Sequence, residues 1–175
     1  MYDRISDKVK STCLDKKIPV IISADHSNAG GTIAGLSKAY PNEKIGVVWI
    51  DAHADLHSPY TTPSGNIHGM PLATALAEDN TSSKLNEVDK NTIEKWDKLK
   101  GDSQRVMPEH IIFFGVRDTE KQEDELIERL NMKIFSVSDV RENGEKKCVD
   151  ETLNLLSDCD LIYVSLDVDS LELEF

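Results

Sequence analysis

The sequence contains few cysteines, few aromatic residues and little positive charge. Three of its 175 residues are cysteines (Cys13, Cys148 and Cys159), and aromatic residues make up 6% of the chain. An odd number of widely spaced cysteines argues against a disulfide framework and for free thiols in a reducing compartment. Lys and Arg number 20 against 32 Asp and Glu, which gives a formal net charge of -12. Because such a surface repels phosphate groups, we expect neither nucleic acid nor an anionic membrane as a partner.

Long apolar segments are also missing. The first four residues, Met-Tyr-Asp-Arg, do not begin a signal peptide, and no run of residues has the length of a membrane span. We therefore expect a cytoplasmic protein. With 39% hydrophobic and 30% charged residues, the composition is typical of a globular protein, and 175 residues suffice for one domain, residues 1–175, with a sizeable core.

Short apolar runs alternate with longer amphipathic ones. The apolar runs predict strands covered on both faces, at residues 18–23, 45–50, 111–116, 133–137 and 161–166. The amphipathic runs predict helices at residues 30–39, 68–78, 92–100, 119–130 and 149–156. This alternation indicates an α/β fold with three α/β/α layers around a mainly parallel sheet. Because the chain stops soon after the last strand, we expect it to be a fragment or a truncated product.

Asp51, His53 and Asp55 follow the strand predicted at residues 45–50. They occupy alternate positions in the segment DAHAD. If the strand geometry persists, their side chains share one face at the carboxyl edge of the sheet, where open α/β folds place their sites. The alternative is that these residues only cap a helix or line a turn.

Two more clusters follow predicted strands in the same way. Asp25 and His26 come after residues 18–23, and Asp167 and Asp169 come after residues 161–166. Carboxylates that lie so close together need a cation to neutralise them. The predicted metal ligands are His26, Asp51, His53, Asp55, Asp167 and Asp169. Oxygen and imidazole donors without cysteine suit manganese better than structural zinc, and six ligands suit two ions. A two-ion site lowers the pKa of a bridging water, so the predicted reaction class is metal-assisted hydrolysis.

Five motifs resemble those of the ureohydrolases, a family that includes arginases, agmatinases and formimidoylglutamases. They are SADHS at 23–27, DAHAD at 51–55, SGNIHG at 64–69, FGVRD at 114–118 and SLDVD at 165–169. The resemblance spans nearly the whole chain and is closest to arginase. It implies two manganese ions, with Asp51 and Asp167 bridging them, and a homo-oligomer. His68 matches the family histidine thought to shuttle protons, for which an imidazole is suited near neutral pH; the alternative is a residue that only packs at a helix start.

The resemblance also implies a substrate. Ser64 and Asn66 match the arginase segment that hydrogen-bonds the α-carboxylate of the amino acid, and hydroxyl and amide donors suit that group. Glu120 lies where arginases place an acidic group near the α-amino end, although a solvated helix start explains it equally well. The expected reaction is therefore hydrolysis of L-arginine to L-ornithine and urea. Agmatine and formimidoylglutamate are the alternative substrates.

Several positions depart from the family pattern. His57 stands where arginases commonly have Asn, so it is expected to alter contacts to the substrate carboxylate; Glu120 and Glu172 stand where the family has Asp. The later strand that supplies a glutamate for the guanidinium group is missing, as are the first elements of the family fold, so the chain looks truncated at both ends. A second hypothesis is therefore a non-catalytic, metal-binding remnant. For the chain as it stands we expect weak activity or none.

Overall fold

The computed structural model describes residues 1–171, and these residues divide into two compact units. The first unit comprises Met1–Glu43 and Asp55–Arg105. The second comprises Lys44–Ala54 and the described chain from Val106 onward. The boundary falls inside the motif DAHAD, between Ala54 and Asp55. That the chain forms a single domain stays a prediction.

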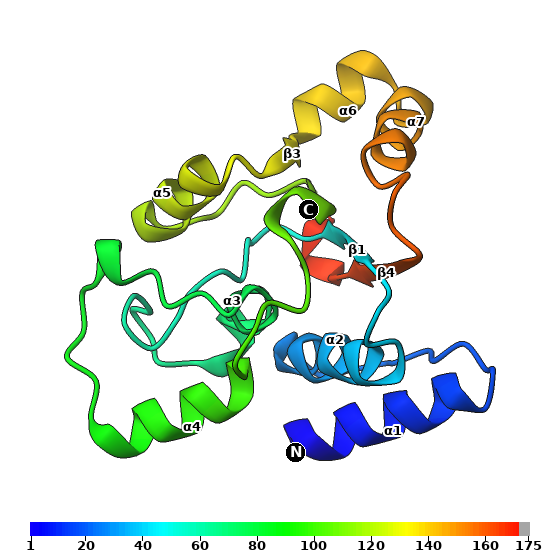
Figure 1. Ribbon diagram of the computed structural model, residues 1–175. Helices are drawn as coiled ribbons and strands as arrows, with labels where there is room; N and C mark the ends of the chain where they lie inside the picture. Colours follow the sequence, from blue (N-terminus) through cyan, green and yellow to red (C-terminus); the bar gives the residue numbers. More distant parts are fainter. Residues whose placement is uncertain (172–175) are drawn as a thin grey trace. The chain divides into compact units, whose positions relative to one another are not determined.

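The second unit is built on a parallel sheet of four strands in the order β3-β2-β1-β4 (Figure 1). Its strands are β1 (Ile45–Ile50), β2 (Ile111–Phe114), β3 (Lys133–Phe135) and β4 (Leu161–Leu166). β1 is central, and Trp49 lies opposite Phe113 of β2 and Ser165 of β4. All strands run in one direction, so their carboxyl ends share one edge of the sheet and their amino ends share the other.

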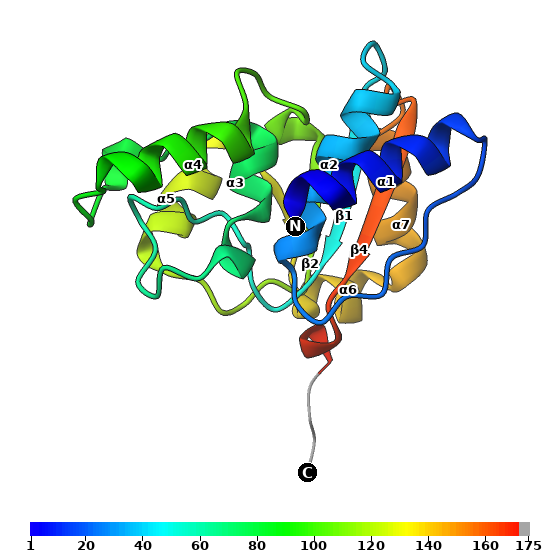
Figure 2. The same cartoon turned by 90° about the horizontal axis from the view of Figure 1, so that it is seen from below.

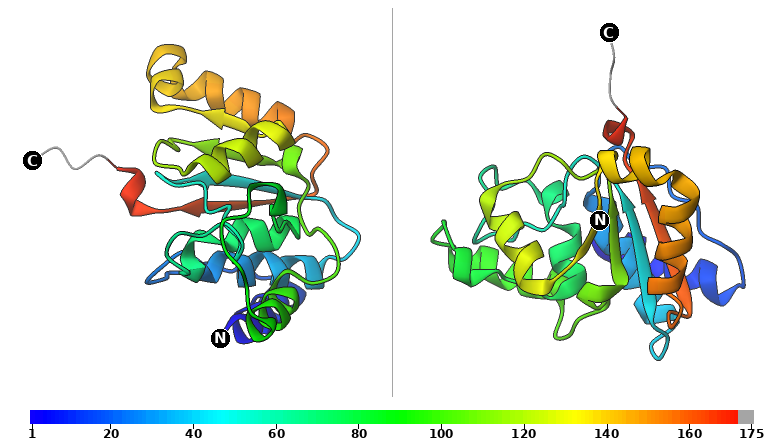
Figure 3. Two further views of the ribbon diagram at one scale, coloured as in Figure 1. Left: turned by 90° about the vertical axis from the view of Figure 1, so that its left-hand side faces the viewer. Right: turned by 90° about the horizontal axis from the view of Figure 1, so that it is seen from above.

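Helices and short turns precede, connect or follow these strands. They are η3 (Pro108–His110), α5 (Lys121–Leu130), α6 (Val137–Asn143), α7 (Glu145–Leu155) and η4 (Val168–Ser170). Figures 2 and 3 show α7 running alongside the strands. Cys148 of α7 and the following Leu156 pack against Ile112 and Phe135 in one hydrophobic cluster. Burial of these side chains fixes α7 on that face of the sheet.

The first unit is helical. It contains α1 (Tyr2–Leu14), α2 (Ser27–Ala39), η1 (Ile67–Gly69), α3 (Pro71–Leu76), η2 (Thr81–Ser83) and α4 (Lys90–Lys100). α1 and α2 lie side by side (Figure 1) and approach closely at Gly35, where a Cβ atom would be 2.6 Å from the carbonyl oxygen of Ser6. Trp96 of α4 packs against Met70 and Ala73 near α3. The Trp96 indole nitrogen donates to Asp79 Oδ1 over 2.6 Å.

The fold class is confirmed as α/β with a parallel sheet, and two predicted strands, residues 45–50 and 161–166, match residue for residue. The prediction that residues 161–166 are covered on both faces is wrong, because β4 is an edge strand whose Val164 and Leu166 side chains are exposed. The strand predicted at residues 18–23 is wrong, because this segment forms no strand and its Ile18 and Ile22 side chains are almost fully exposed. α1 and α6 were not predicted. Glu172 lies outside the described residues. Within residues 1–171, no helix has the length and hydropathy needed to cross a membrane.

Candidate metal centre

The second unit brings four predicted metal ligands to the carboxyl edge of its sheet. Asp51 and His53 follow β1, and Asp167 and Asp169 follow β4, its neighbour. Asp51 donates its backbone N–H to the carbonyl of Phe114 and Asp167 donates its own to Ile50, so backbone pairing across three strands fixes where the acidic residues emerge. The parallel arrangement therefore places these side chains together, as the sequence predicted.

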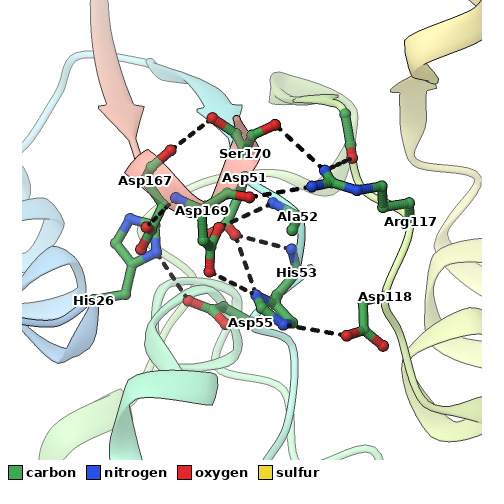
Figure 4. A network of polar contacts seen from close by, with 11 residues as sticks. His26, Asp51, Ala52, His53, Asp55, Arg117, Asp118, Asp167, Asp169 and Ser170 are labelled. Carbon is green, nitrogen blue, oxygen red and sulfur yellow. Dashed lines mark hydrogen bonds and ion pairs between the residues drawn. The ribbon is translucent and has the colours of Figure 1, made fainter. Parts of the chain in front are cut away.

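His53 lies among three carboxylates (Figure 4). Its Nδ1 atom is 3.2 Å from Asp169 Oδ2 and 3.5 Å from Asp51 Oδ1, while its Nε2 atom is 3.6 Å from Asp118 Oδ2. Asp51 is buried, with a side chain only 1% exposed, whereas His53 and Asp169 are nearly half exposed. Asp51, His53 and Asp169 each offer one donor atom within 4.8 Å of the others. A cation bound by these three residues would contact one buried ligand, Asp51, and two partly exposed ligands, His53 and Asp169.

The charge of this cluster is unfavourable without a cation. Burial raises the pKa of the Asp169 carboxyl above its usual value, and the negative charges of Asp51 and Asp167 raise it further. Crowded carboxylates of this kind disfavour ionisation, and a bound divalent ion would remove the penalty. The donors are carboxylate oxygens and one imidazole, which fits manganese. The residues present therefore fit the predicted metal.

Two residues that were not predicted as part of the site complete its surroundings, and both belong to the motif FGVRD. The guanidinium of Arg117 donates to the backbone carbonyls of Asp169 at 3.1 Å and Ser170 at 3.4 Å, which holds the turn η4 in place. Asp118 faces the second ring nitrogen of His53. A carboxylate in that position orients a metal-binding imidazole and fixes its tautomer. The family motif FGVRD includes Arg117 and Asp118, but their spacing in the sequence did not predict these contacts.

The remaining two predicted ligands, His26 and Asp55, lie in the first unit. His26 Nδ1 is 3.2 Å from Asp55 Oδ2, and both side chains are largely buried (Figure 4). His26 directly precedes α2, and Asp55 accepts a hydrogen bond at its carbonyl from Leu72 of α3. Asp55 has a φ of 52°. The chain therefore leaves the extended conformation after Ile50, and the assumption that strand geometry continues through DAHAD is wrong.

The predicted substrate residues of the first unit lie on one loop and the turn that follows it. Ser64 and Asn66 are exposed, and Ser64 Oγ accepts the backbone N–H of Asn66 over 3.2 Å. His68 is exposed on η1. His57 differs, because it is buried and its Nδ1 atom lies 3.1 Å from Thr61 Oγ1. This contact gives His57 a role in fixing the loop.

Glu120, the remaining predicted substrate residue, begins α5 in the second unit. Its backbone N–H donates to Glu123 Oε2 over 3.2 Å, and Glu123 is buried. This is the pattern of a helix amino-terminal cap, in which an acidic side chain three residues into the helix satisfies the first backbone donor. The structure thus supports a helix-start role for the pair, and binding of a substrate amine by Glu120 stays a prediction.

The whole chain, residues 1–175, matches the model of the Arginase family. It is 36% identical to the arginase of Bacillus subtilis (strain 168) over 170 residues, which are 97% of this chain and 52% of that protein. It is also 36% identical to the arginase of Staphylococcus aureus (strain COL), covering 98% of this chain and 54% of that one. The chain spans about half the length of the curated relatives it matches.

Solved structures give the same result. The arginase from Bacillus subtilis subsp. subtilis str. 168 superimposes with a TM-score of 0.82 at 35% identity, covering 98% of this chain and 54% of that chain. An Entamoeba histolytica arginase in complex with L-ornithine has a TM-score of 0.78 at 30% identity, with coverage of 96% and 54%. Formimidoylglutamase from Bacillus subtilis, at 20% identity and a TM-score of 0.71, covers 98% of this chain and 46% of its own and shares the fold alone.

Proposed function

Because this chain belongs to the arginase family, we propose that it carries the metal-binding part of a manganese-dependent hydrolase that converts L-arginine to L-ornithine and urea. The observation that carries the proposal is the cluster of Asp51, His53 and Asp169 at the carboxyl edge of the sheet. The arginase relatives support the guanidino group as the target. A cytoplasmic location and a homo-oligomer belong to the same proposal.

The six predicted ligands would divide between two ions, as the arginase resemblance implies. One manganese would be held by His26, Asp51, Asp55 and Asp167, and the other by Asp51, His53, Asp167 and Asp169. Asp51, His53 and Asp55 belong to one five-residue motif, DAHAD. When bound, the paired cations would activate water for attack on the guanidinium carbon.

Residues outside the ligand set bind the substrate and move protons. Ser64 and Asn66, exposed on their loop, would donate hydrogen bonds to the α-carboxylate of arginine. An imidazole nitrogen of the exposed His68 would deliver a proton to the leaving amine nitrogen of ornithine and take another from solvent. Agmatine lacks the carboxylate, so this loop favours arginine over agmatine.

Manganese binding to the chain tests the ligand assignment. We expect two ions per chain by calorimetric titration, and loss of one of them in His53→Ala. Glu142→Gln is a matched control, because Glu142 is an exposed acidic residue on α6 with no part in the cluster. Equal binding by both variants, or no manganese binding by the unmodified chain, would rule out the proposed centre.

Product analysis with the protein as it is naturally produced tests the reaction. Urea release from arginine should exceed urea release from agmatine and formamide release from formimidoylglutamate. Ser64→Ala should raise KM for arginine about tenfold, the effect of losing one hydrogen bond to a charged group, and leave KM for agmatine unchanged. The chain spans only about half of its relatives, so a metal-binding protein without activity is the second candidate. Manganese binding without any urea release would favour that candidate.

A further inference from the structure

A second cluster of metal-binding side chains lies at the opposite edge of the sheet. The amino-terminal ends of β1, β2 and β4 meet there, because these strands are parallel neighbours. Lys44 directly precedes β1, His110 directly precedes β2, and Asp158 and Cys159 lie in the turn from α7 to β4. All of these residues belong to the second unit. None belongs to the ligand set of the proposed manganese centre.

The donor atoms of His110, Asp158 and Cys159 are close enough for one ion. One atom from each lies within 4.8 Å of the other two, and His110 Nε2 is 3.3 Å from Asp158 Oδ1. The His110 side chain is only 9% exposed, whereas that of Asp158 is 53% exposed and Cys159 is partly exposed. An ion at this point would therefore have the buried His110 on one side and water on the other.

Backbone hydrogen bonds fix the main chain at two of these residues before any ion binds. His110 ends the turn η3, in which its N–H donates to the carbonyl of Met107. The Cys159 N–H donates to the carbonyl of Leu156. The sulfur of Cys159 lies 3.3 Å from where a Cβ atom of Gly46 would be, so the glycine leaves room for the thiol. A site whose ligands are already oriented loses less conformational freedom on binding.

The donors differ from those of the manganese centre. One imidazole nitrogen, one carboxylate oxygen and one sulfur form a mixed set that suits zinc or another thiophilic divalent ion, with water as the fourth ligand. Burial raises the pKa of the Cys159 thiol, so the sulfur is protonated at neutral pH in the absence of metal. On binding, the S–H bond breaks, its proton goes to solvent, and a metal–thiolate bond forms. One thiolate and one carboxylate then balance the two charges of the ion.

Lys44 would compete with a metal ion for the Asp158 carboxylate. Its Nζ atom lies 2.6 Å from Asp158 Oδ2, while the other oxygen of that carboxylate faces His110. The ammonium group of Lys44 therefore forms an ion pair with the Asp158 carboxylate, which a metal ion would have to displace. Both side chains of this ion pair are more than half exposed, and exposed pairs of this kind are weak.

We propose that His110, Asp158 and Cys159 form a second cation site, selective for zinc and similar thiophilic ions, which links the amino-terminal ends of β2 and β4 across β1. Such a site would stabilise the sheet at the edge opposite the manganese centre. The proposed hydrolysis does not require this cation site, so a test of the site is independent of a test of the activity.

Cobalt(II) titration of the chain tests the proposal, because cobalt replaces zinc in mixed nitrogen and sulfur sites. A thiolate bound to cobalt gives a near-ultraviolet charge-transfer band, whereas cobalt bound at the manganese centre, which has no cysteine ligand, does not. We expect the band to appear, to saturate at one ion per chain and to disappear on addition of zinc. Absence of the band in the unmodified chain overturns the proposal.

Variants identify the ligands. Cys159→Ala should abolish the band, and His110→Gln or Asp158→Asn should weaken cobalt binding about tenfold or more. Cys13→Ala is the matched control, because Cys13 is also a free thiol but lies on α1, and it should keep the full band. Lys44→Met should tighten binding about two- to fivefold by removing the competitor. A band that persists in Cys159→Ala, or unchanged affinity in His110→Gln, would contradict the assignment.

Discussion

The electrostatic surroundings of Asp169 indicate a position where a cation would bind. Burial raises the pKa of its carboxyl, and the charges of Asp51 and Asp167 add to this effect. The Asp169 N–H nevertheless donates to Asp167 Oδ1 over 3.0 Å, and Arg117 binds its carbonyl, so the backbone holds the side chain inside the crowded cluster. A residue fixed in an unfavourable electrostatic position is a candidate ligand.

Asp169 and Asp118 provide a matched pair for separating direct from indirect contacts to the metal. Asp169→Asn removes a ligand and should weaken manganese binding more than about a hundredfold, whereas Asp118→Asn only loses a contact to His53 and should weaken it about tenfold. Calorimetric titration of both variants gives the two dissociation constants. Equal losses would place both carboxylates in the same role and contradict the arrangement in Figure 4.

At the level of helices and strands, continuous apolar runs predicted β1 and β4, although Val164 and Leu166 of β4 are exposed. β1 is apolar throughout and lies between two strands, so a continuous apolar run identified it. Residues 18–22 have the same character but are exposed, because a strand also needs a neighbour to pair with, and composition does not reveal the neighbour. α1 was missed because its buried residues, Ser6, Val9 and Cys13, have helical spacing but only weak hydrophobicity.

The contact between α1 and α2 depends on the absence of a side chain at Gly35. A Cβ atom there would lie 2.6 Å from the Ser6 carbonyl oxygen and 2.7 Å from Val9 Cβ, so α1 would have to move. Gly35→Ala should therefore lower the free energy of unfolding by about 1–3 kcal/mol, despite the better helix propensity of alanine.

Urea denaturation measures this change. Gly69→Ala serves as the control, since the nearest atom to its new Cβ would be 3.9 Å away, an ordinary contact. The control should change stability by about 0.5 kcal/mol or less. If Gly35→Ala is no more harmful than Gly69→Ala, the two helices do not depend on this close approach.

Across the whole molecule, how well the sequence predicts the place of a candidate site residue depends on what positions that residue. The predicted ligands around Asp51 follow strands of one parallel sheet, and strand order alone brings such strand ends together, so the sequence was enough to predict that Asp51, His53 and Asp169 lie close together. His57 and Glu120 depend on loop packing and helix capping instead. Their local partners, Thr61 and Glu123, explain their positions without a ligand, and no sequence pattern distinguishes the two roles.

Because the chain is acidic, we expect metal binding to raise the stability of the folded protein as well. With a net charge of -12, the chain repels itself, and the cluster at Asp169 concentrates that repulsion. An ion that binds only the folded state stabilises it by about 2.7 kcal/mol at a hundred times its dissociation constant. For a chain of this size we therefore expect manganese to raise Tm by about 5–10 °C.

Thermal unfolding with and without manganese measures this shift, and sodium chloride at equal ionic strength shows how much of it comes from screening alone. Asp169→Asn should lose most of the manganese effect, because the variant keeps nearly all of the negative charge but lacks one ligand. Screening acts on the total charge and would stabilise both proteins equally. A shift that is the same for sodium chloride and manganese, or for the variant and the unmodified chain, would therefore assign the effect to net charge and not to a centre built from strand ends.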